Sequence, residues 1–144
     1  MEMAKVVEDV AFNILKQAVI YLPDDVKEAL KKAYAEETSE TGKTQLRAIL
    51  DNIDLAEKYK APVCQDTGTI IFYIKAGSKA KDMDKVEAAL INATRKATKE
   101  VPLRPNAVDP FSGKNSGDNT GRYIPALNWE IVPGDTVEMT VMTK

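Results

Sequence analysis

The stretch TIIFYIK, residues 69–75, is a run of β-branched and aromatic side chains with the length of one strand. Its apolar residues follow one another too continuously for the exposed edge of a sheet, so the stretch predicts a buried strand. Helical patterns precede this strand, and both helical and strand patterns follow it.

Upstream of the strand the apolar side chains recur at helical spacing. In residues 6–22 they predict one buried stripe, formed by Val7, Val10, Ile14, Ala18 and Tyr21. Pro23 ends this helix, and residues 23–37 predict a second one with acidic side chains in its first turn. A third amphipathic helix runs through residues 46–56 and ends before Pro62, because a residue that precedes proline avoids helical dihedral angles.

Downstream of the strand, residues 82–100 predict a fourth helix. Residues 101–125 are rich in proline, glycine, asparagine and aspartate and show no hydrophobic period. A stretch of this length without regular structure is usually functional or disordered. Residues 126–132 and 136–144 predict two strands joined by the turn PGD as an antiparallel hairpin.

These elements predict an α+β fold. The helical N-terminal part packs on a small, mostly antiparallel sheet made by residues near 69–75, 127–132 and 136–143. With 144 residues the chain has the length of a single domain, residues 1–144. Because it stops at Lys144 directly after a strand pattern, we expect it to be cut short of its natural end.

Composition excludes several classes of function. The chain has 20 basic and 22 acidic residues and a net charge of −2, without the clustered basic excess of a nucleic-acid-binding protein. No stretch approaches the roughly 20 apolar residues of a membrane span. The N-terminus has no apolar core of a signal peptide, and a single cysteine forms no internal disulfide, so we expect a cytoplasmic protein. The absence of histidine excludes Ser–His and Cys–His catalysis within this chain.

Two residues stand out as candidates for a site. Cys64, the only cysteine, lies in a polar turn with Gln65 and Asp66. A lone cysteine is often a small buried hydrophobic residue, but backbone N–H groups of a turn favour the thiolate that binds metal. Arg104 lies between Leu103 and Pro105; it is either a surface arginine or a bidentate clamp for a carboxylate.

Three motifs give the chain a resemblance to a known family. They are APVCQDTGT (61–69), LRPNAVDP (103–110) with NSGDNTG (115–121), and IVPGDTVEMTVMTK (131–144). In this order they resemble the class I, iron–sulfur-dependent fumarate hydratases, and specifically the N-terminal half of the alpha subunit of the two-subunit form. The same family includes L-tartrate dehydratase. Together with the helical N-terminus, the resemblance covers essentially the whole chain.

The resemblance implies a hydro-lyase that interconverts fumarate and (S)-malate, a reaction of the tricarboxylic acid cycle. In this family three cysteines hold a [4Fe–4S] cluster, whose fourth iron has no protein ligand and acts as a Lewis acid. Cys64 matches the first of the three cysteines. Gln65 and Asp66 match residues that contact the substrate, and Arg104 matches an arginine that binds a substrate carboxylate. We expect Cys64, Gln65, Asp66 and Arg104 to converge on one concave face.

The chain also departs from the family pattern. It lacks the other two cluster cysteines and the residues that the beta subunit supplies, and no catalytic base is identified in it. We therefore expect the fragment to carry no cluster and to be inactive alone. The expected partners are the remaining half of the alpha subunit, the beta subunit and a four-carbon dicarboxylate, and an uncovered strand edge predicts self-association as a dimer. The alternatives are L-tartrate dehydratase and a non-catalytic binding domain on the same scaffold.

Overall fold

A computed structural model describes residues 3–64 and 69–144 of the chain. The chain forms two compact units. The first contains Met1–Ala18 and Asp66–Lys144, and the second contains Val19–Gln65. In the described ranges, no helix combines the length and the apolar content needed to cross a bilayer.

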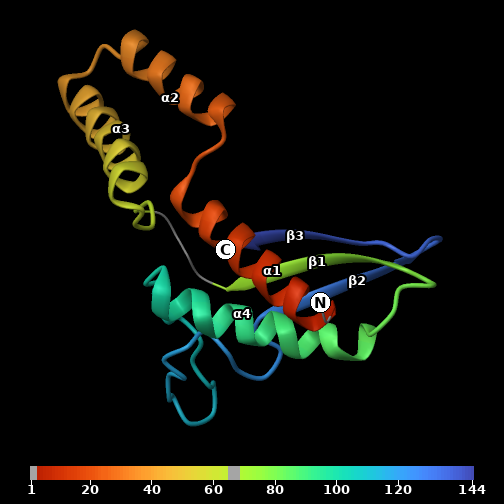
Figure 1. Ribbon diagram of the computed structural model, residues 1–144. Coiled ribbons are helices and arrows are strands. Elements are labelled where there is room, and N and C mark those ends of the chain that lie inside the picture. The colour runs from red at the N-terminus through yellow and green to blue at the C-terminus, as the bar shows by residue number, and fades with distance from the viewer. Residues whose placement is uncertain (1–2, 65–68) are drawn as a thin grey trace. The chain divides into compact units, whose positions relative to one another are not determined.

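The first unit is built around a three-stranded sheet with strand β1 (Ile70–Gly77) in its centre. Strand β2 (Ala126–Val132) pairs with β1 in parallel, and strand β3 (Val137–Thr143) pairs with it antiparallel on the other side (Figure 1). The predicted α+β class and all three strand segments are confirmed, and the stretch predicted at 69–75 coincides with the central strand except for Thr69.

The predicted hairpin between the last two strands is wrong, because β2 and β3 each pair with β1 and not with each other. Residues 133–136 cross the end of β1, where backbone N–H groups of Gly77, Ser78 and Lys79 donate to carbonyl oxygens of Thr136, Val132 and Gly134, each at 2.8 Å. Strands on either side of a central strand lie about 10 Å apart, a distance that four residues span. A short turn is therefore compatible with both pairings, and the sheet is mixed.

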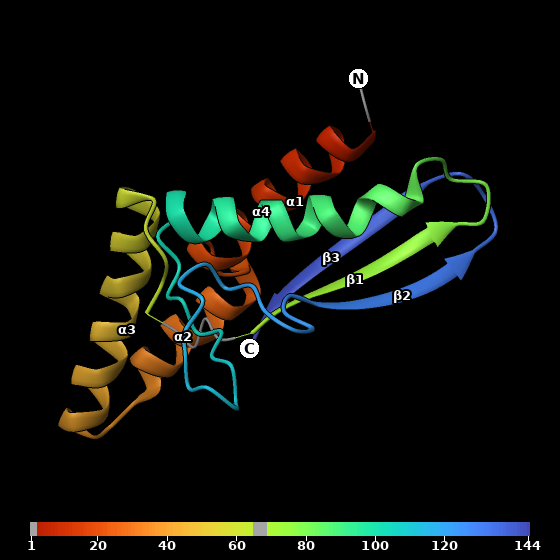
Figure 2. The same ribbon diagram turned by 90° about the horizontal axis from the view of Figure 1, so that it is seen from below.

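Helices α1 (Met3–Ile20) and α4 (Val86–Glu100) lie on the same side of this sheet, and a 3₁₀ turn at Met83–Lys85 precedes α4 (Figure 2). Ile70, Phe72 and Ile74 of β1 are buried, whereas the alternate side chains of Tyr73 and Lys75 are exposed. The sheet therefore has one covered face and one open face.

The buried stripe of α1 differs from the predicted one. Val7, Ala11 and Leu15 are buried, at 3%, 0% and 0% exposure, whereas Val10 is 42% exposed and Tyr21 is 39% exposed. The helix carries apolar side chains on two adjacent faces, and both have helical spacing. The sequence alone does not show which of these faces is covered.

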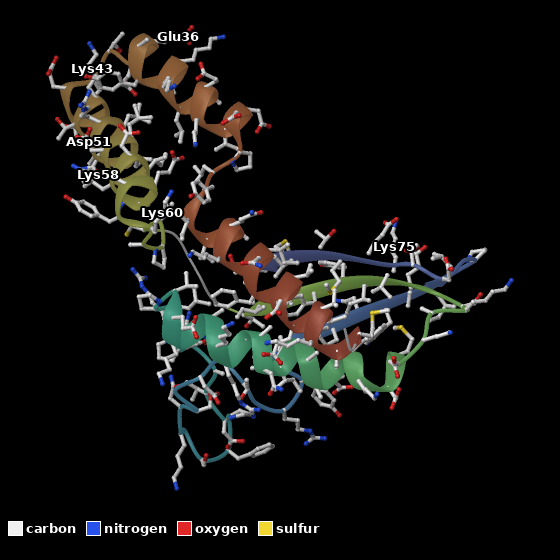
Figure 3. All side chains as sticks on the ribbon, viewed as in Figure 1. Glu36, Lys43, Asp51, Lys58, Lys60 and Lys75 are labelled. Atoms are coloured by element: carbon white, nitrogen blue, oxygen red, sulfur yellow. The ribbon has the colours of Figure 1, made fainter. Side chains whose placement is uncertain are left out.

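The second unit contains helices α2 (Asp24–Glu36) and α3 (Glu40–Tyr59), which pack as a helical hairpin. Ser39 caps α3, its side chain accepting from the N–H of Gly42, and Lys27 pairs with Glu57 across the hairpin. The core consists of Ile53, Ala56 and Val63, with Leu22 and Leu30 packed against it. Charged side chains, among them Lys43, Asp51 and Lys58, line α3 outside this small core (Figure 3).

Candidate functional site

Residues 101–125, which we call the polar loop, follow α4 and lead into β2. Val101, Leu103 and Ala107 are buried at its beginning and fix the chain to the first unit. The loop contains no helix or strand, but short-range hydrogen bonds order it throughout. The lack of a hydrophobic period therefore reflects a loop held by polar contacts.

The tip of the polar loop is a narrow turn closed by Asp109. The N–H of Asp109 donates to the carbonyl of Lys114 at 2.9 Å, and the N–H of Ser116 donates to the carbonyl of Ala107 at 3.0 Å. The carboxylate of Asp109 accepts from the N–H of Phe111 (3.1 Å) and from both the N–H (2.7 Å) and the hydroxyl (2.8 Å) of Ser112. The hydrogen bonds from Ser112, first from its backbone and then from its hydroxyl, lower the pKa of Asp109.

Asn119 is the centre of the polar loop and is only 3% exposed. Its side-chain nitrogen donates to the carbonyl oxygen of Arg104 at 2.9 Å and to the hydroxyl of Thr98 at 3.1 Å. Its side-chain oxygen accepts from the backbone N–H of Asn106 at 2.7 Å. Its φ of 58° lies in the left-handed region, which asparagine tolerates better than most residues. Asn119 thus joins two distant parts of the loop to α4.

Asp118 makes a second connection between the loop and α4. It accepts from the Nε of Arg95 at 3.2 Å and from the N–H and the hydroxyl of Thr120 at 3.0 and 2.7 Å. Partial burial raises the pKa of Asp118, but the hydrogen bonds from Thr120, Ser116 and Arg95 together bring this pKa below its ordinary value. The carboxylate is therefore held ionised at neutral pH.

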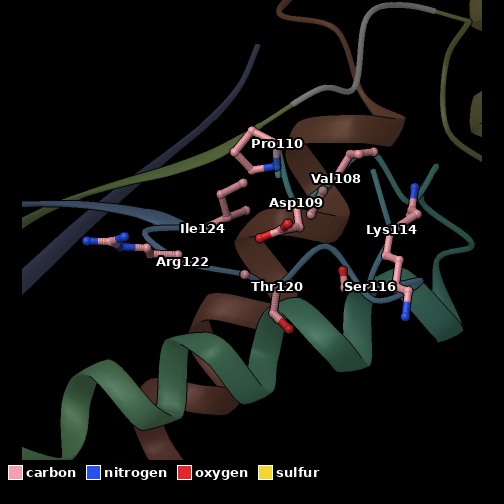
Figure 4. A pocket seen from close by; sticks show the side chains of 11 residues that line it. Val108, Asp109, Pro110, Lys114, Ser116, Thr120, Arg122 and Ile124 are labelled. Atoms are coloured by element: carbon pink, nitrogen blue, oxygen red, sulfur yellow. The ribbon is translucent and has the colours of Figure 1, made fainter. Parts of the chain in front are cut away.

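A cavity of about 550 Å³ lies inside the polar loop. Asp109, Ser116 and Thr120 contribute polar groups to its lining, and Lys114 and Arg122 lie on opposite sides of it (Figure 4). Two cationic side chains and several hydroxyl groups suit this cavity to a small polar molecule.

Arg104 lies at the start of the loop with its side chain exposed. Its backbone is fixed, because Leu103 is buried beside it and its carbonyl accepts from Asn119. In the described part of the chain, no residue forms a hydrogen bond or an ion pair with its guanidinium. An exposed guanidinium on a fixed backbone is available to bind a carboxylate.

Cys64 belongs to the second unit, where its thiol is free and exposed. Its N–H donates to the side-chain oxygen of Asn52 at 2.8 Å. Together with Ile49, Ile53 and Val63 it lines a mostly apolar cavity of about 470 Å³. The small buried hydrophobic role is therefore excluded for this cysteine.

The convergence of the four predicted site residues stays a prediction. Gln65 and Asp66 lie outside the described residues, and Cys64 and Arg104 belong to different units.

Comparison with known proteins assigns the chain to a family. The sequence profile of the family described as fumarate hydratase (fumerase) matches residues 8–144. The chain belongs to the fumarate hydratase family. This confirms the family that the three motifs predicted.

Relatives in the fumarate hydratase family carry alpha-subunit names. The chain is 40% identical over 134 residues to the L(+)-tartrate dehydratase subunit alpha of Escherichia coli strain UTI89, and this match covers 92% of the chain and 44% of the relative. It is 41% identical over 126 residues to a Methanocaldococcus jannaschii protein whose name assigns it provisionally to the same subunit, covering 86% of the chain and 44% of the relative. The chain therefore spans less than half the length of the curated relatives it matches.

The fumarate hydratase family implies an iron–sulfur cluster. Of the ligands that such a cluster needs, this chain offers one cysteine, Cys64. Cys64 forms no disulfide and is exposed, so its thiol is available as a ligand. Within residues 3–64 and 69–144, however, there is no group of three cysteine, histidine, aspartate or glutamate side chains that could hold a metal ion. The chain has one cysteine, and a cubane cluster needs at least three protein ligands, so further ligands must come from outside this sequence.

Sequence reasoning proposed Arg104 as a site residue, which stays a prediction, and gave no role to Asn119 or Thr98, which hold the loop beside it. Asn119 lies in the motif NSGDNTG, which marked the family without indicating a role for its individual residues. The signal that would have found it is an asparagine within a stretch rich in glycine, asparagine and aspartate, where left-handed backbone is common. Thr98 gave no such signal, because a threonine inside a helix most often bonds back to its own backbone.

Proposed function

We propose that this chain is the N-terminal part of the alpha subunit of a two-subunit hydro-lyase that interconverts fumarate and (S)-malate. The observation that carries the proposal is the family match over residues 8–144, together with relatives named as alpha subunits. In such an enzyme the chain supplies part of a shared site, and the rest comes from the missing portion of the alpha subunit and from the beta subunit.

Arg104 is the residue whose geometry best supports a role in this site. A dicarboxylate needs fixed cationic partners, and a guanidinium offers two parallel N–H groups to one carboxylate. The exposed guanidinium of Arg104, on a backbone fixed by Asn119, meets this need. We assign Gln65 and Asp66 to further contacts with the substrate on the strength of their position beside Cys64 in the motif VCQDTG.

Cys64 is proposed as one thiolate ligand of a [4Fe–4S] cluster that the complete enzyme assembles. When bound, such a cluster supplies a Lewis-acidic iron for the hydroxyl and a carboxylate of the substrate. The exposed thiol and the hydrogen bond that fixes the backbone of Cys64 to Asn52 support this assignment. An exposed free thiol also suits a reducing cytoplasm, where we place the protein.

L(+)-tartrate is the second candidate substrate. It is supported by the printed names of the Escherichia coli relatives, which call them L(+)-tartrate dehydratase subunits alpha. Tartrate and malate are both four-carbon dicarboxylates with a hydroxyl on the carbon next to a carboxylate. The clamp proposed for Arg104 therefore serves either substrate.

The test is to express the complete alpha subunit with its beta partner, reconstitute iron and sulfide without oxygen, and assay fumarate, (S)-malate and L(+)-tartrate side by side. We expect turnover of at least one of the three and its loss in Cys64→Ser. Turnover of tartrate alone would replace fumarate by tartrate as the substrate. A complex that binds its partner but acts on none of the three would favour a non-catalytic binding domain.

A further inference from the structure

The hydrogen bonds of Asn119 converge on the two residues on either side of Pro105. On one side it donates to the carbonyl of Arg104, and on the other it accepts from the N–H of Asn106, at 2.9 and 2.7 Å. One side chain thus fixes both peptide groups around a proline whose own φ is already restricted. The backbone from which Arg104 extends has little freedom left.

Thr98 fixes Asn119 in turn. Its hydroxyl accepts from the side chain of Asn119 at 3.1 Å, and its single proton is shared between the carbonyl oxygens of Thr94 at 2.9 Å and Asp118 at 3.1 Å. Thr98 lies on α4 with 8% exposure, and Ala93 and Ala97 of the same helix are fully buried. A continuous chain of contacts therefore runs from the core helix through Thr98 and Asn119 to the backbone of Arg104.

Burial makes these contacts costly to lose. The side chain of Asn119 is 3% exposed, so water does not readily replace a missing partner, and an unsatisfied buried amide carries its full desolvation penalty. Arg104 itself is exposed at the other end of the chain of contacts. This combination of a rigid buried support and an exposed cationic side chain is the arrangement of a prepositioned binding group.

We propose that Asn119, held by Thr98, is a positioning residue that sets the direction of the Arg104 guanidinium toward a substrate carboxylate. The inference rests on the proposed function, because it assigns Arg104 to substrate binding. Asn119 acts through Arg104 and touches no substrate. Its removal weakens binding of the dicarboxylate more than it slows the chemical step.

The kinetic test uses the complete alpha–beta enzyme. Asn119→Gly removes the side chain but keeps a residue suited to a φ of 58°, and we expect KM to rise about tenfold while kcat falls less than about threefold. Thr98→Val should also raise KM. Thr98→Ser, which keeps the hydroxyl, should have a KM close to that of the wild type. Ser112→Ala, at the tip of the loop and away from Arg104, is the matched control and should leave KM unchanged.

A double-mutant cycle decides whether Asn119 acts through Arg104. In an Arg104→Met background, Asn119→Gly should raise KM no further, because the group that it positions is gone. If the two effects multiply, or if Asn119→Gly lowers kcat with KM unchanged, the inference is overturned.

Amide hydrogen exchange separates this inference from the proposed function. The N–H of Asn106 should be protected in the wild type and lose protection in Asn119→Gly. If the enzyme acts on none of the dicarboxylates, the proposed function fails, yet loss of this protection still supports Asn119 as the support of the Arg104 backbone. Unchanged protection of Asn106 overturns the inference whatever the activity.

Discussion

At the scale of single residues, the polar loop depends on two carboxylates whose pKa values are lowered by hydrogen bonds. Asp109 closes the tip of the loop, and Asp118 ties the loop to Arg95 of α4. Both carboxylates accept from backbone N–H groups, which favours the ionised form. The hydrogen bonds of the loop are therefore strongest at a pH at which both carboxylates are ionised.

Lowering the pH should loosen this loop. Because the folded-state pKa of Asp118 lies below the ordinary 3.8, its contribution to stability is complete above about pH 4 and is lost as the pH falls through the lower folded value. We expect the free energy of unfolding, measured in urea, to fall between pH 5 and pH 2 more steeply for the wild-type chain than for Asp118→Asn. Equal steepness in both proteins would contradict a stabilising role for the Asp118 carboxylate.

Single residues also show where sequence reasoning stops. The exposure of Cys64 and the fixed neighbourhood of Arg104 follow from a polar turn and from the flanking Leu103 and Pro105. The contacts of Asn119 with Thr98 and Arg104 join positions 15 to 21 residues apart. Such contacts depend on the path of the loop across α4, which no local pattern encodes.

At the scale of elements, the turn at residues 133–136 fixes the end of β1. Gly77, the last residue of β1, lies against this turn, and a Cβ atom built on it would be 2.6 Å from the carbonyl oxygen of Gly134. The neighbour is backbone held by three hydrogen bonds, so it cannot move aside without disturbing the connection between β2 and β3.

Gly77→Ala should therefore destabilise the chain by about 1–3 kcal/mol, measured as the free energy of unfolding in urea. Gly121→Ala is the matched control, because a Cβ atom there meets nothing within 4 Å. The control should change the free energy of unfolding by less than about 1 kcal/mol. An equal change in the free energy of unfolding for both substitutions would show that the turn at residues 133–136 does not exclude a Cβ atom at Gly77.

The elements themselves were largely predictable, whereas their pairing was not. The proline break at Pro23, the buried strand at residues 69–75 and the helix that follows it each rest on local signals that packing did not override. The β2–β1–β3 order and the choice of the Val7–Ala11–Leu15 face of α1 rest on long-range packing. For the strand order and for the buried face of α1 alike, two arrangements fit the same sequence pattern. Only the structure of the first unit shows which arrangement forms.

At the scale of the whole molecule, the sheet of the first unit has two edge strands. Among the strands of the described residues, β2 and β3 each pair with β1 alone. On β2, Trp129 is 41% exposed and Ile131 is 70% exposed. Unpaired backbone groups beside exposed apolar side chains are a template for another chain.

We expect the 144-residue chain to form dimers in solution through such an edge. Light scattering at increasing protein concentration should show a dimer, and Ile131→Lys, which places a charge on the β2 edge, should shift it toward monomer. Thr140→Lys, on the open face of β3, is the control and should have less effect. A monomer at all concentrations would show that these edges do not pair with a second copy of the chain. The family assignment would not be affected.

Two of the proposed site residues belong to different units. Cys64 lies in the second unit and Arg104 in the first, and their convergence on one site stays a prediction. The family was predictable from short motifs, and the same motifs supplied Cys64 and Arg104 as candidate site residues, whose roles stay predictions. The positions of their functional atoms relative to one another depend on the complete assembly, and one domain over residues 1–144 stays a prediction.

A crystal structure of the complete alpha–beta enzyme with a bound dicarboxylate tests the central claim most directly. The account predicts the guanidinium of Arg104 within about 3 Å of a substrate carboxylate oxygen. It also predicts the sulfur of Cys64 as a ligand of the cluster at the same site. A substrate held by other groups, with Arg104 facing solvent and Cys64 bound to no metal, would contradict it.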